Sequence, residues 1–212
     1  MAYQFVKASN QFLSINDTAI LDVTGAITLA CHAKRNADLS TAQSLISKYE
    51  SPSNRSYILQ INTSGGLSSR FARDGTTNFI SGANSTSTIP TNWSHLATTW
   101  TPNVVGAIMY LNGIAGGTPS SSNSNSVIYS GSANLTIGSG YGGEIAEVGI
   151  WSAALSAAEI ASLAKGMTCD KIRPQSLVFY APLVRNLQDA KGGLTITNNG
   201  GATVATHPRV YA

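Results

Sequence analysis

The chain has 212 residues, of which 42% are hydrophobic and only 11% carry a charged side chain. A chain of this size hides roughly 70% of its unfolded surface, so it is able to form a core without disulfides. The formal net charge is +3, and its carriers stand singly or in pairs, such as Lys34 with Arg35. No run of like charges and no apolar stretch near 18 residues is present, so we expect no nucleic-acid partner and no membrane insertion.

Short runs rich in β-branched and aromatic residues recur along the chain, separated by clusters of Gly, Asn, Ser and Pro. This spacing is typical of an all-β antiparallel sandwich or jelly roll. The predicted strands cover residues 3–6, 11–15, 26–34, 43–49, 56–62, 67–71, 93–101, 106–112, 134–138, 144–151, 177–183, 194–197 and 203–206. The Ser- and Asn-rich residues 117–132 are expected to form a flexible surface loop.

Local patterns add detail to this β-sandwich. Ile27, Leu29 and Cys31 share one face of a strand by period-2 alternation, which predicts that Cys31 is a buried core thiol. Asn112-Gly113 follows an alternating run, and this pair favours a type I′ hairpin turn because both residues accept positive φ. The two cysteines have no metal-ligand or redox spacing, so free thiols are favoured over a bridge.

One segment departs from the strand pattern. Ser156 stands three residues before Glu159, which is the spacing of a capping box, and Gly166 is a typical helix stop. We therefore expect one short helix near residues 156–165, packed on the sandwich. Cys169, just beyond it, is expected near the surface.

Five motifs occur in a fixed order between Thr91 and Gly166. They are Trp93–Ala97, Met109–Gly113, Leu135–Gly138, Gly143–Trp151 and Ala154–Ile160. Together they resemble the laminin-G-like, concanavalin A-type jelly-roll family, and residues 5–15 resemble its opening strands. The tail from Leu177 to Tyr211 is similar to the ending of laminin-G-like proteins of phages and prophages. The resemblance implies a single laminin-G-like jelly-roll domain over residues 1–212, with its N- and C-terminal strands pairing.

The acidic residues do not favour an enzyme. A glycosidase needs two carboxylates that flank the scissile bond. The nearest pair here is Glu144 and Glu147, and a regular strand places residues three apart on opposite faces. The resemblance gives His95 a structural role in a Trp-x-His-x-Ala motif, and no Gly-x-Ser-x-Gly elbow is present. We expect no catalytic residues.

Calcium is the one metal that the sequence leaves open. Ca²⁺ takes six to eight oxygen ligands, usually with several carboxylates among them. Asp74, in an Asp-Gly pair, is the best loop candidate, but Arg70 and Arg73 flank it. An ordinary turn is favoured, so we expect no cofactor and disfavour calcium.

Four side chains are candidates for glycan binding: Gln60, Asn62, His95 and Tyr110. Alternation directs them away from the core, and if their strands are neighbours they share a concave surface. Sugar sites combine an aromatic group with amide and hydroxyl groups. A solvated or partner-covered sheet face is the favoured alternative interpretation.

The resemblance, the N-terminus without a basic and apolar signal region, and the low-charge polar surface together favour a non-enzymatic phage virion structural protein. We expect a capsid decoration or tail-surface protein, assembled in the host cytoplasm. Its partners would be other virion proteins, copies of itself and host-surface glycans. The alternative is a carbohydrate-binding lectin module of a cell-surface or secreted system.

Overall fold

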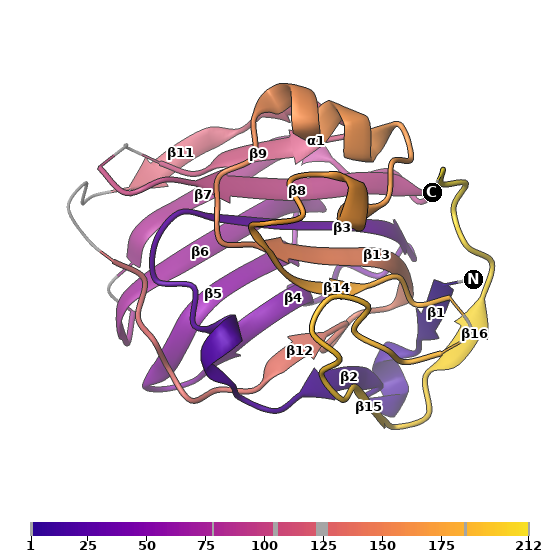
Figure 1. The fold of residues 1–212 in the computed structure, drawn as a ribbon. Helices are drawn as coiled ribbons and strands as arrows, with labels where there is room; N and C mark the ends of the chain where they lie inside the picture. The colour runs from indigo at the N-terminus through magenta and orange to yellow at the C-terminus, as the bar shows by residue number, and fades with distance from the viewer. Residues whose placement is uncertain (1, 78, 104–105, 122–126, 185, 212) are drawn as a thin grey trace.

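The computed structural model describes residues 2–77, 79–103, 106–121, 127–184 and 186–211. Within these residues the chain forms two antiparallel sheets that pack face to face (Figure 1). The prediction of an all-β antiparallel sandwich is confirmed. None of the helices in the described residues is long and apolar enough to cross a membrane.

The first sheet, called sheet A, contains both the first and the last strand. In spatial order its strands are β10 (Ile114–Gly116), β9 (Ile108–Leu111), β8 (Ser94–Trp100), β3 (Ile27–Arg35), β13 (Gly143–Trp151), β1 (Ala2–Phe5) and β16 (Thr203–Ala205). Strand β14 (Leu177–Ala181) pairs with β13 beside β1. The turn between β9 and β10 has positive φ at Asn112 and Gly113 (51° and 82°), as the predicted type I′ turn requires.

The second sheet, called sheet B, forms the opposite layer. In spatial order its strands are β11 (Thr118–Ser121), β7 (Phe79–Thr88), β6 (Gly66–Gly75), β5 (Asn54–Ile61), β4 (Gln43–Glu50), β12 (Leu135–Ile137), β2 (Phe12–Ile15) and β15 (Thr197–Asn199). Short 3₁₀ helices η1 (Lys7–Ser9), η2 (Ala19–Leu21) and η3 (Cys169–Lys171) lie in the connections. The remaining element is the α-helix α1 (Ala157–Ala164).

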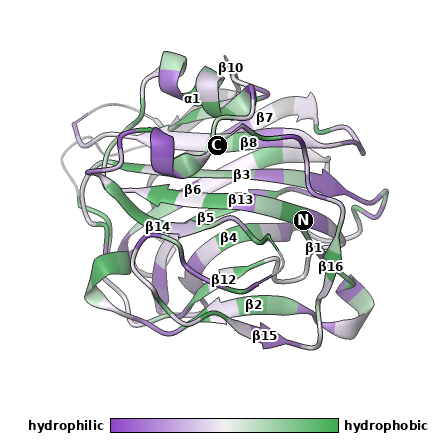
Figure 2. Cartoon of the chain, turned by 45° about the vertical axis from the view of Figure 1, so that its right-hand side comes forward, coloured by the Kyte–Doolittle hydropathy of each residue, from purple (hydrophilic) through white to green (hydrophobic). Residues whose placement is uncertain are grey.

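The main core fills the space between the two sheets. Hydrophobic and hydrophilic residues alternate along many of the strands (Figure 2), and the hydrophobic side of these strands faces the core. Ile27, Leu29 and Cys31 of β3 are all fully buried there, which confirms the prediction for Cys31. Tyr57 and Leu59 of β5 enter the same core from sheet B. The face of each sheet that points away from this core is called its outer face below.

Two segments differ from the sequence-based expectations. Strand β7 was not expected, because Phe79–Thr88 is rich in Ser, Gly and Asn and has little hydrophobic alternation. The loop predicted over residues 117–132 begins as strand β11, which pairs with β7, so that prediction is wrong for residues 118–121. Residues 122–126 of this loop lie outside the described residues. Pairing with a neighbouring strand decides the structure here, and composition does not.

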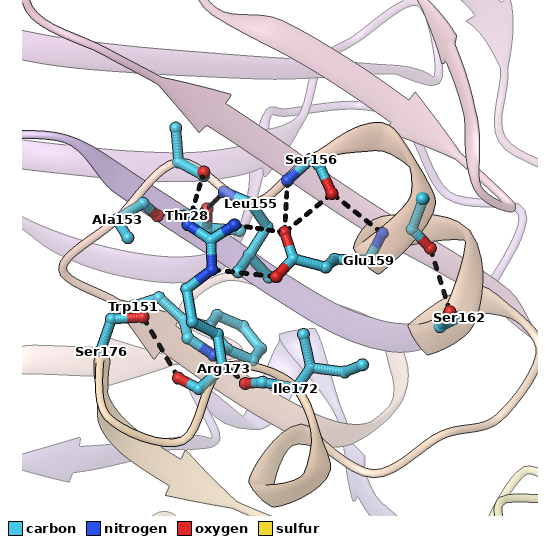
Figure 3. Close-up of polar contacts among 12 residues, drawn as sticks. Thr28, Trp151, Ala153, Leu155, Ser156, Glu159, Ser162, Ile172, Arg173 and Ser176 are labelled. Atoms are coloured by element: carbon cyan, nitrogen blue, oxygen red, sulfur yellow. Dashed lines mark hydrogen bonds and ion pairs between the residues drawn. The ribbon is translucent and has the colours of Figure 1, made fainter.

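Helix α1 begins with the predicted capping box. The Ser156 hydroxyl accepts a hydrogen bond from the backbone N–H of Glu159, whose carboxylate accepts one from the N–H of Ser156 (Figure 3). Arg173 donates two hydrogen bonds of 2.9 and 2.6 Å to the same carboxylate. The Thr28 hydroxyl of β3 accepts a hydrogen bond from the N–H of Leu155, which ties the start of the helix to sheet A. The prediction of a short helix near 156–165 is confirmed.

The outer face of sheet A carries a second hydrophobic cluster beneath α1. Its members are Ala30, Ala97, Tyr110, Trp151, Leu155, Ile160, Leu163, Cys169, Ile172, Leu177 and Tyr180. Cys169 is 2% exposed, so the prediction that it lies near the surface is wrong. Helix η3, which carries Cys169, packs against β13 and β14, and Cys169 is its buried residue.

The last residues form a tail strap, residues 206–211, over the outer face of sheet A. Strand β16 pairs with β1, with Ala205 opposite Ala2. The strap then brings Nε2 of His207 to 3.1 Å from Oε1 of Glu147 on β13. The backbone N–H of Tyr211 donates to the carbonyl of Gly166, at the end of α1. Helix α1 and the tail strap therefore both lie on sheet A.

Candidate functional site

The four predicted glycan-binding residues lie on two different sheets. Gln60 lies in β5 and Asn62 directly follows it, so both belong to sheet B. His95 lies in β8 and Tyr110 in β9, both in sheet A. The outer faces of the two sheets point in opposite directions, so the prediction of one shared surface is wrong. The prediction assumed that the strands carrying these residues are neighbours in one sheet. Alternation within a strand does not reveal which strands pair.

His95 and Tyr110 are also inaccessible. Their side chains point outward from sheet A, as expected, but they are only 3% and 4% exposed. Tyr110 belongs to the hydrophobic cluster beneath α1. The ring of His95 lies 5.0 Å from that of His32, centroid to centroid. Burial lowers the pKa of His95 well below its ordinary value, and the neighbouring His32 lowers it further.

Asn62 and Asp74 have local structural partners, and Gln60 is buried. The side-chain Oδ1 of Asn62 accepts hydrogen bonds from the backbone N–H groups of Ser64 and Gly66, which closes the turn between β5 and β6. Gln60 lies on the outer face of sheet B and is 8% exposed. Asp74 accepts hydrogen bonds from the backbone N–H and the hydroxyl of Thr76, at 3.0 and 2.6 Å. That geometry is an Asx turn, the role favoured for Asp74 from its sequence.

The two glutamates of β13 do not lie on opposite faces. Glu147 has a φ of +52°, and the pairing register between β13 and β3 shifts at this point, which marks a β-bulge. The extra residue turns the Glu147 carboxylate to the outer face of sheet A, where Tyr180 donates a 2.6 Å hydrogen bond to it. Glu144 lies on the same face, paired with Lys34 at 3.0 Å. The expectation that the two glutamates point to opposite faces was wrong. Oε1 of Glu144 is paired with Lys34, and the Glu147 carboxylate is held by Tyr180 and His207.

A polar hollow of about 420 Å³ lies on the outer face of sheet B. It is lined by Phe12, Ser44, Ser47, Tyr49, Glu50, Ile58, Ser132, Asn134, Thr136 and Ser139. These residues come from β2, β4, β5 and β12 and from the loops that flank β12. We call this set the sheet B hollow.

Alternation along the strands aims these side chains outward. In β12, Leu135 and Ile137 are fully buried in the core, so Thr136 between them points into the sheet B hollow. The Thr136 hydroxyl donates to the carbonyl of Ser47 on β4, and its lone pairs remain able to accept from a ligand. The same alternation was visible in the sequence of both strands, but it did not show that they are adjacent.

The chemistry of the sheet B hollow suits an uncharged, hydroxyl-rich ligand. Serine and threonine hydroxyls both donate and accept hydrogen bonds, and the Asn134 amide adds two donors. Tyr49 and Phe12 supply apolar ring surface of the kind that contacts the C–H groups of a sugar. Among the described residues, no group of three or more His, Cys, Asp or Glu side chains is arranged to hold a metal ion.

Comparison with known proteins identifies the family and the fold of the chain. A family model described as the concanavalin A-like lectin/glucanases superfamily (Laminin_G_3) matches residues 7–161. No curated protein sequence matches the chain.

Three solved structures illustrate the range of similar folds. A Bacteroides ovatus ATCC 8483 protein described as carbohydrate-binding shares 19% identity over 100% of this chain, with a TM-score of 0.74. This chain spans 61% of the length of that protein. The Ruminococcus gnavus IT-sialidase CBM40 bound to α2,3-sialyllactose shares 12% identity over 77% of this chain and 95% of its own, with a TM-score of 0.59. A heptameric SAP-like pentraxin of Limulus polyphemus shares 15% identity over 94% of this chain and 96% of its own, with a TM-score of 0.56.

Proposed function

Because the chain belongs to the concanavalin A-like lectin/glucanases superfamily, we propose that it is a non-catalytic carbohydrate-binding module. Its ligand would occupy the sheet B hollow. The observation that carries this proposal is the difference between the two outer faces. Helix α1 and the tail strap lie on sheet A, and charged side chains of a hollow at its edge pair with each other, Lys34 with Glu144 and Lys7 with Asp38. The hollow of about 420 Å³ on sheet B is lined mainly by Ser, Thr and Asn side chains.

The composition of the hollow supports a glycan as the ligand. Its walls combine hydroxyl and amide groups with the rings of Tyr49 and Phe12, which is the mixture that sugar sites use. Two of the similar structures belong to proteins described by carbohydrate binding or by a bound sialyllactose. The lectin-module alternative of the sequence analysis is therefore better supported than the virion role, for which the comparisons supply no argument.

A binding role without catalysis fits the way in which the two carboxylates of β13 are paired with other side chains. Glu144 is paired with Lys34, and Glu147 is buried beneath the tail strap with Tyr180 and His207. A glycosidase needs a pair that flanks an open site. In the sheet B hollow, Glu50 is the one carboxylate among the lining residues. We propose an extracellular or cell-surface setting, where glycans are exposed, and self-association stays a prediction.

The test is a glycan array followed by isothermal titration calorimetry with the glycans that bind. Tyr49→Ala, which removes the ring at the wall of the sheet B hollow, should weaken binding at least 10-fold. Tyr110→Phe is the matched control, because Tyr110 is another tyrosine of a sheet but lies beneath α1. This control should bind as the wild type does.

Two results would overturn the proposal. One is the absence of binding to any glycan by a folded protein with cooperative unfolding. The other is binding that Tyr110→Phe abolishes and Tyr49→Ala leaves unchanged. Release of reducing sugar from a bound glycan would contradict the non-catalytic role.

A further inference from the structure

Two arginines and two aromatic rings form a continuous stack next to the sheet B hollow. The guanidinium carbon of Arg55 lies 5.3 Å from the ring centroid of Tyr49. The rings of Tyr49 and Phe79 are nearly parallel, at 13°, with centroids 6.3 Å apart. The guanidinium carbon of Arg70 lies 5.4 Å from the centroid of Phe79. The four residues, called the Arg–aromatic stack, come from the adjacent strands β4, β5, β6 and β7.

The stack is joined directly to the hollow. Tyr49 belongs to both, since its ring also lines the sheet B hollow. Arg70 lies opposite Ile58 in the pairing of β5 with β6, and Ile58 is another lining residue. A ligand in the hollow is therefore within reach of the guanidinium groups.

The two guanidinium groups keep unused hydrogen-bond donors. Nη2 of Arg55 donates to the Ser51 hydroxyl at 2.8 Å, whereas Nη1 of Arg55 makes no hydrogen bond among the described residues. Nε of Arg55 is buried without a partner, so Nη1 is the donor that a ligand can reach. Arg70 is exposed, and the ion pairs found among the described residues include neither arginine. When a guanidinium group stacks on an aromatic ring, the face of the guanidinium is covered and its N–H edge stays available. The rings thus hold the donors in place before any ligand arrives, which lowers the entropy lost on binding.

The local charge also favours an anion. Among the residues that line the hollow, the carboxylate is that of Glu50, which pairs with neither arginine. Asp74, next to the Gly75 that lies opposite Arg55, is a second carboxylate near the stack, and it accepts hydrogen bonds from Thr76. Arginine edges match the geometry of a carboxylate or sulfate by two parallel N–H···O bonds. Charged bonds of this kind add to the neutral hydroxyl contacts of the hollow.

Building on the proposed function, we propose that the ligand is an acidic glycan. Its carboxylate or sulfate would bind the N–H edge of Arg70, with Arg55 as the second donor. Its uncharged hydroxyl groups would lie in the sheet B hollow. Tyr49 and Phe79 act as positioning residues for the two guanidinium groups.

The test compares matched probes by isothermal titration calorimetry with the full chain. The probes are oligogalacturonate, its methyl ester, which is the same sugar without the charge, and a sulfated galactan oligosaccharide with its desulfated form. We expect at least one acidic probe to bind 10-fold or more tighter than its neutral counterpart. The pair with the larger acidic-over-neutral affinity ratio shows whether the acidic group of the ligand is a carboxylate or a sulfate.

Variants then test whether the Arg–aromatic stack causes the preference for acidic over neutral probes. Arg70→Gln should reduce the acidic-over-neutral ratio to about twofold, and Arg70→Lys should keep an intermediate ratio, because lysine keeps the charge without the paired donors. Glu50→Gln should strengthen binding of the acidic probe. Arg209→Gln is the matched control: Arg209 also stacks on a ring, that of Tyr211 at 5.3 Å, but lies in the tail strap.

The outcomes separate this inference from the proposed function. Equal affinity for acidic and neutral probes overturns the acidic preference and leaves glycan binding intact. A preference that persists in Arg70→Gln, or disappears in Arg209→Gln, also overturns the role of the stack. If folded protein binds neither these probes nor any array glycan, the proposed function fails as well.

Discussion

The ammonium group of Lys48 lies 2.7 Å from Oδ1 of Asp17, although the Lys48 side chain is completely buried. Oδ1 of Asp22 lies 3.0 Å away on another side, and the carbonyl of Gly131 is a third acceptor. Lys48 thus connects β4 with the segment before β3 and with the loop before β12. The sequence shows these residues only as one strand lysine and two separate turn aspartates.

Replacing this lysine should cost much of the protein's stability. Lys48→Met leaves two carboxylates facing each other without their shared cation, so we expect a loss of about 2–4 kcal/mol in the free energy of unfolding. Urea denaturation measures this loss. Lys34→Met is the control, because its pair with Glu144 is partly exposed and should contribute less than about 1 kcal/mol. Equal losses in the two variants would contradict the role of Lys48.

The capping box of α1 gives a second stability prediction. Ser156→Ala removes the acceptor for the N–H of Glu159 and should lower the free energy of unfolding by about 1 kcal/mol. Ser162→Ala is the matched control within the helix. Its hydroxyl donates only to the carbonyl of Ala158, one turn back, so the change should stay within about 0.5 kcal/mol. Urea denaturation of both variants measures the two changes in the free energy of unfolding, and equal changes would contradict the role of the capping box.

Stability should fall as the pH drops below neutrality because of His32 and His95. Burial lowers the pKa of His32 from 6.5 to about 4, with a further contribution from the charge of His207. The pKa of His95 is lowered in the same direction. Both histidines take up protons more readily when unfolded, so their stabilising contribution is complete above pH 6.5 and is lost as the pH falls towards 4.

Denaturation at several pH values tests this expectation. Between pH 7 and pH 5 we expect a loss of about 2 kcal/mol from His32 and a further loss in the same direction from His95. His95→Gln should give a shallower dependence on pH, whatever its effect on stability at pH 7. Ser156→Ala should shift the whole curve without changing its slope. A wild-type curve that is flat from pH 7 to pH 5 would refute the buried, neutral state of these rings.

Both thiols should be unreactive in the native protein. Burial raises the pKa of Cys31 to about 12. Burial also raises the pKa of Cys169, and the nearby Glu147 and Asp170 raise it further. Reaction requires the thiolate, so iodoacetamide at pH 8 should label neither cysteine in native protein and both in guanidinium chloride. Native labelling of Cys169, detected by peptide mass spectrometry, would show that the packing of η3 against β13 and β14 does not bury this thiol.

The features that depend on neighbouring residues in the sequence could be predicted. Period-2 alternation placed Cys31 in the core, and the spacing of Ser156 and Glu159 identified the capping box of α1. The Asn112-Gly113 turn was equally local. In each case the residues that interact are within a few positions of one another, so their pattern is directly visible in the sequence.

The candidate site could not be predicted, because it depends on long-range pairing. Alternation correctly turned His95 and Tyr110 outward, but it did not show that α1 would cover them. The Arg–aromatic stack joins Tyr49 to Phe79 across 30 positions of sequence, through a strand that its composition did not reveal. The bulge at Glu147 is likewise invisible, since it arises from the register between β13 and β3.

The position of the two chain ends has a practical consequence. Strand β1 and the tail strap both belong to the side of the molecule formed by sheet A (Figure 1). The sheet B hollow opens on the opposite side. A tag or linker at either end should therefore anchor the protein to a biosensor chip with the sheet B hollow directed into the solution. Immobilised protein should then keep the affinity measured for free protein, and multivalent display on a bead should gain avidity without redesign.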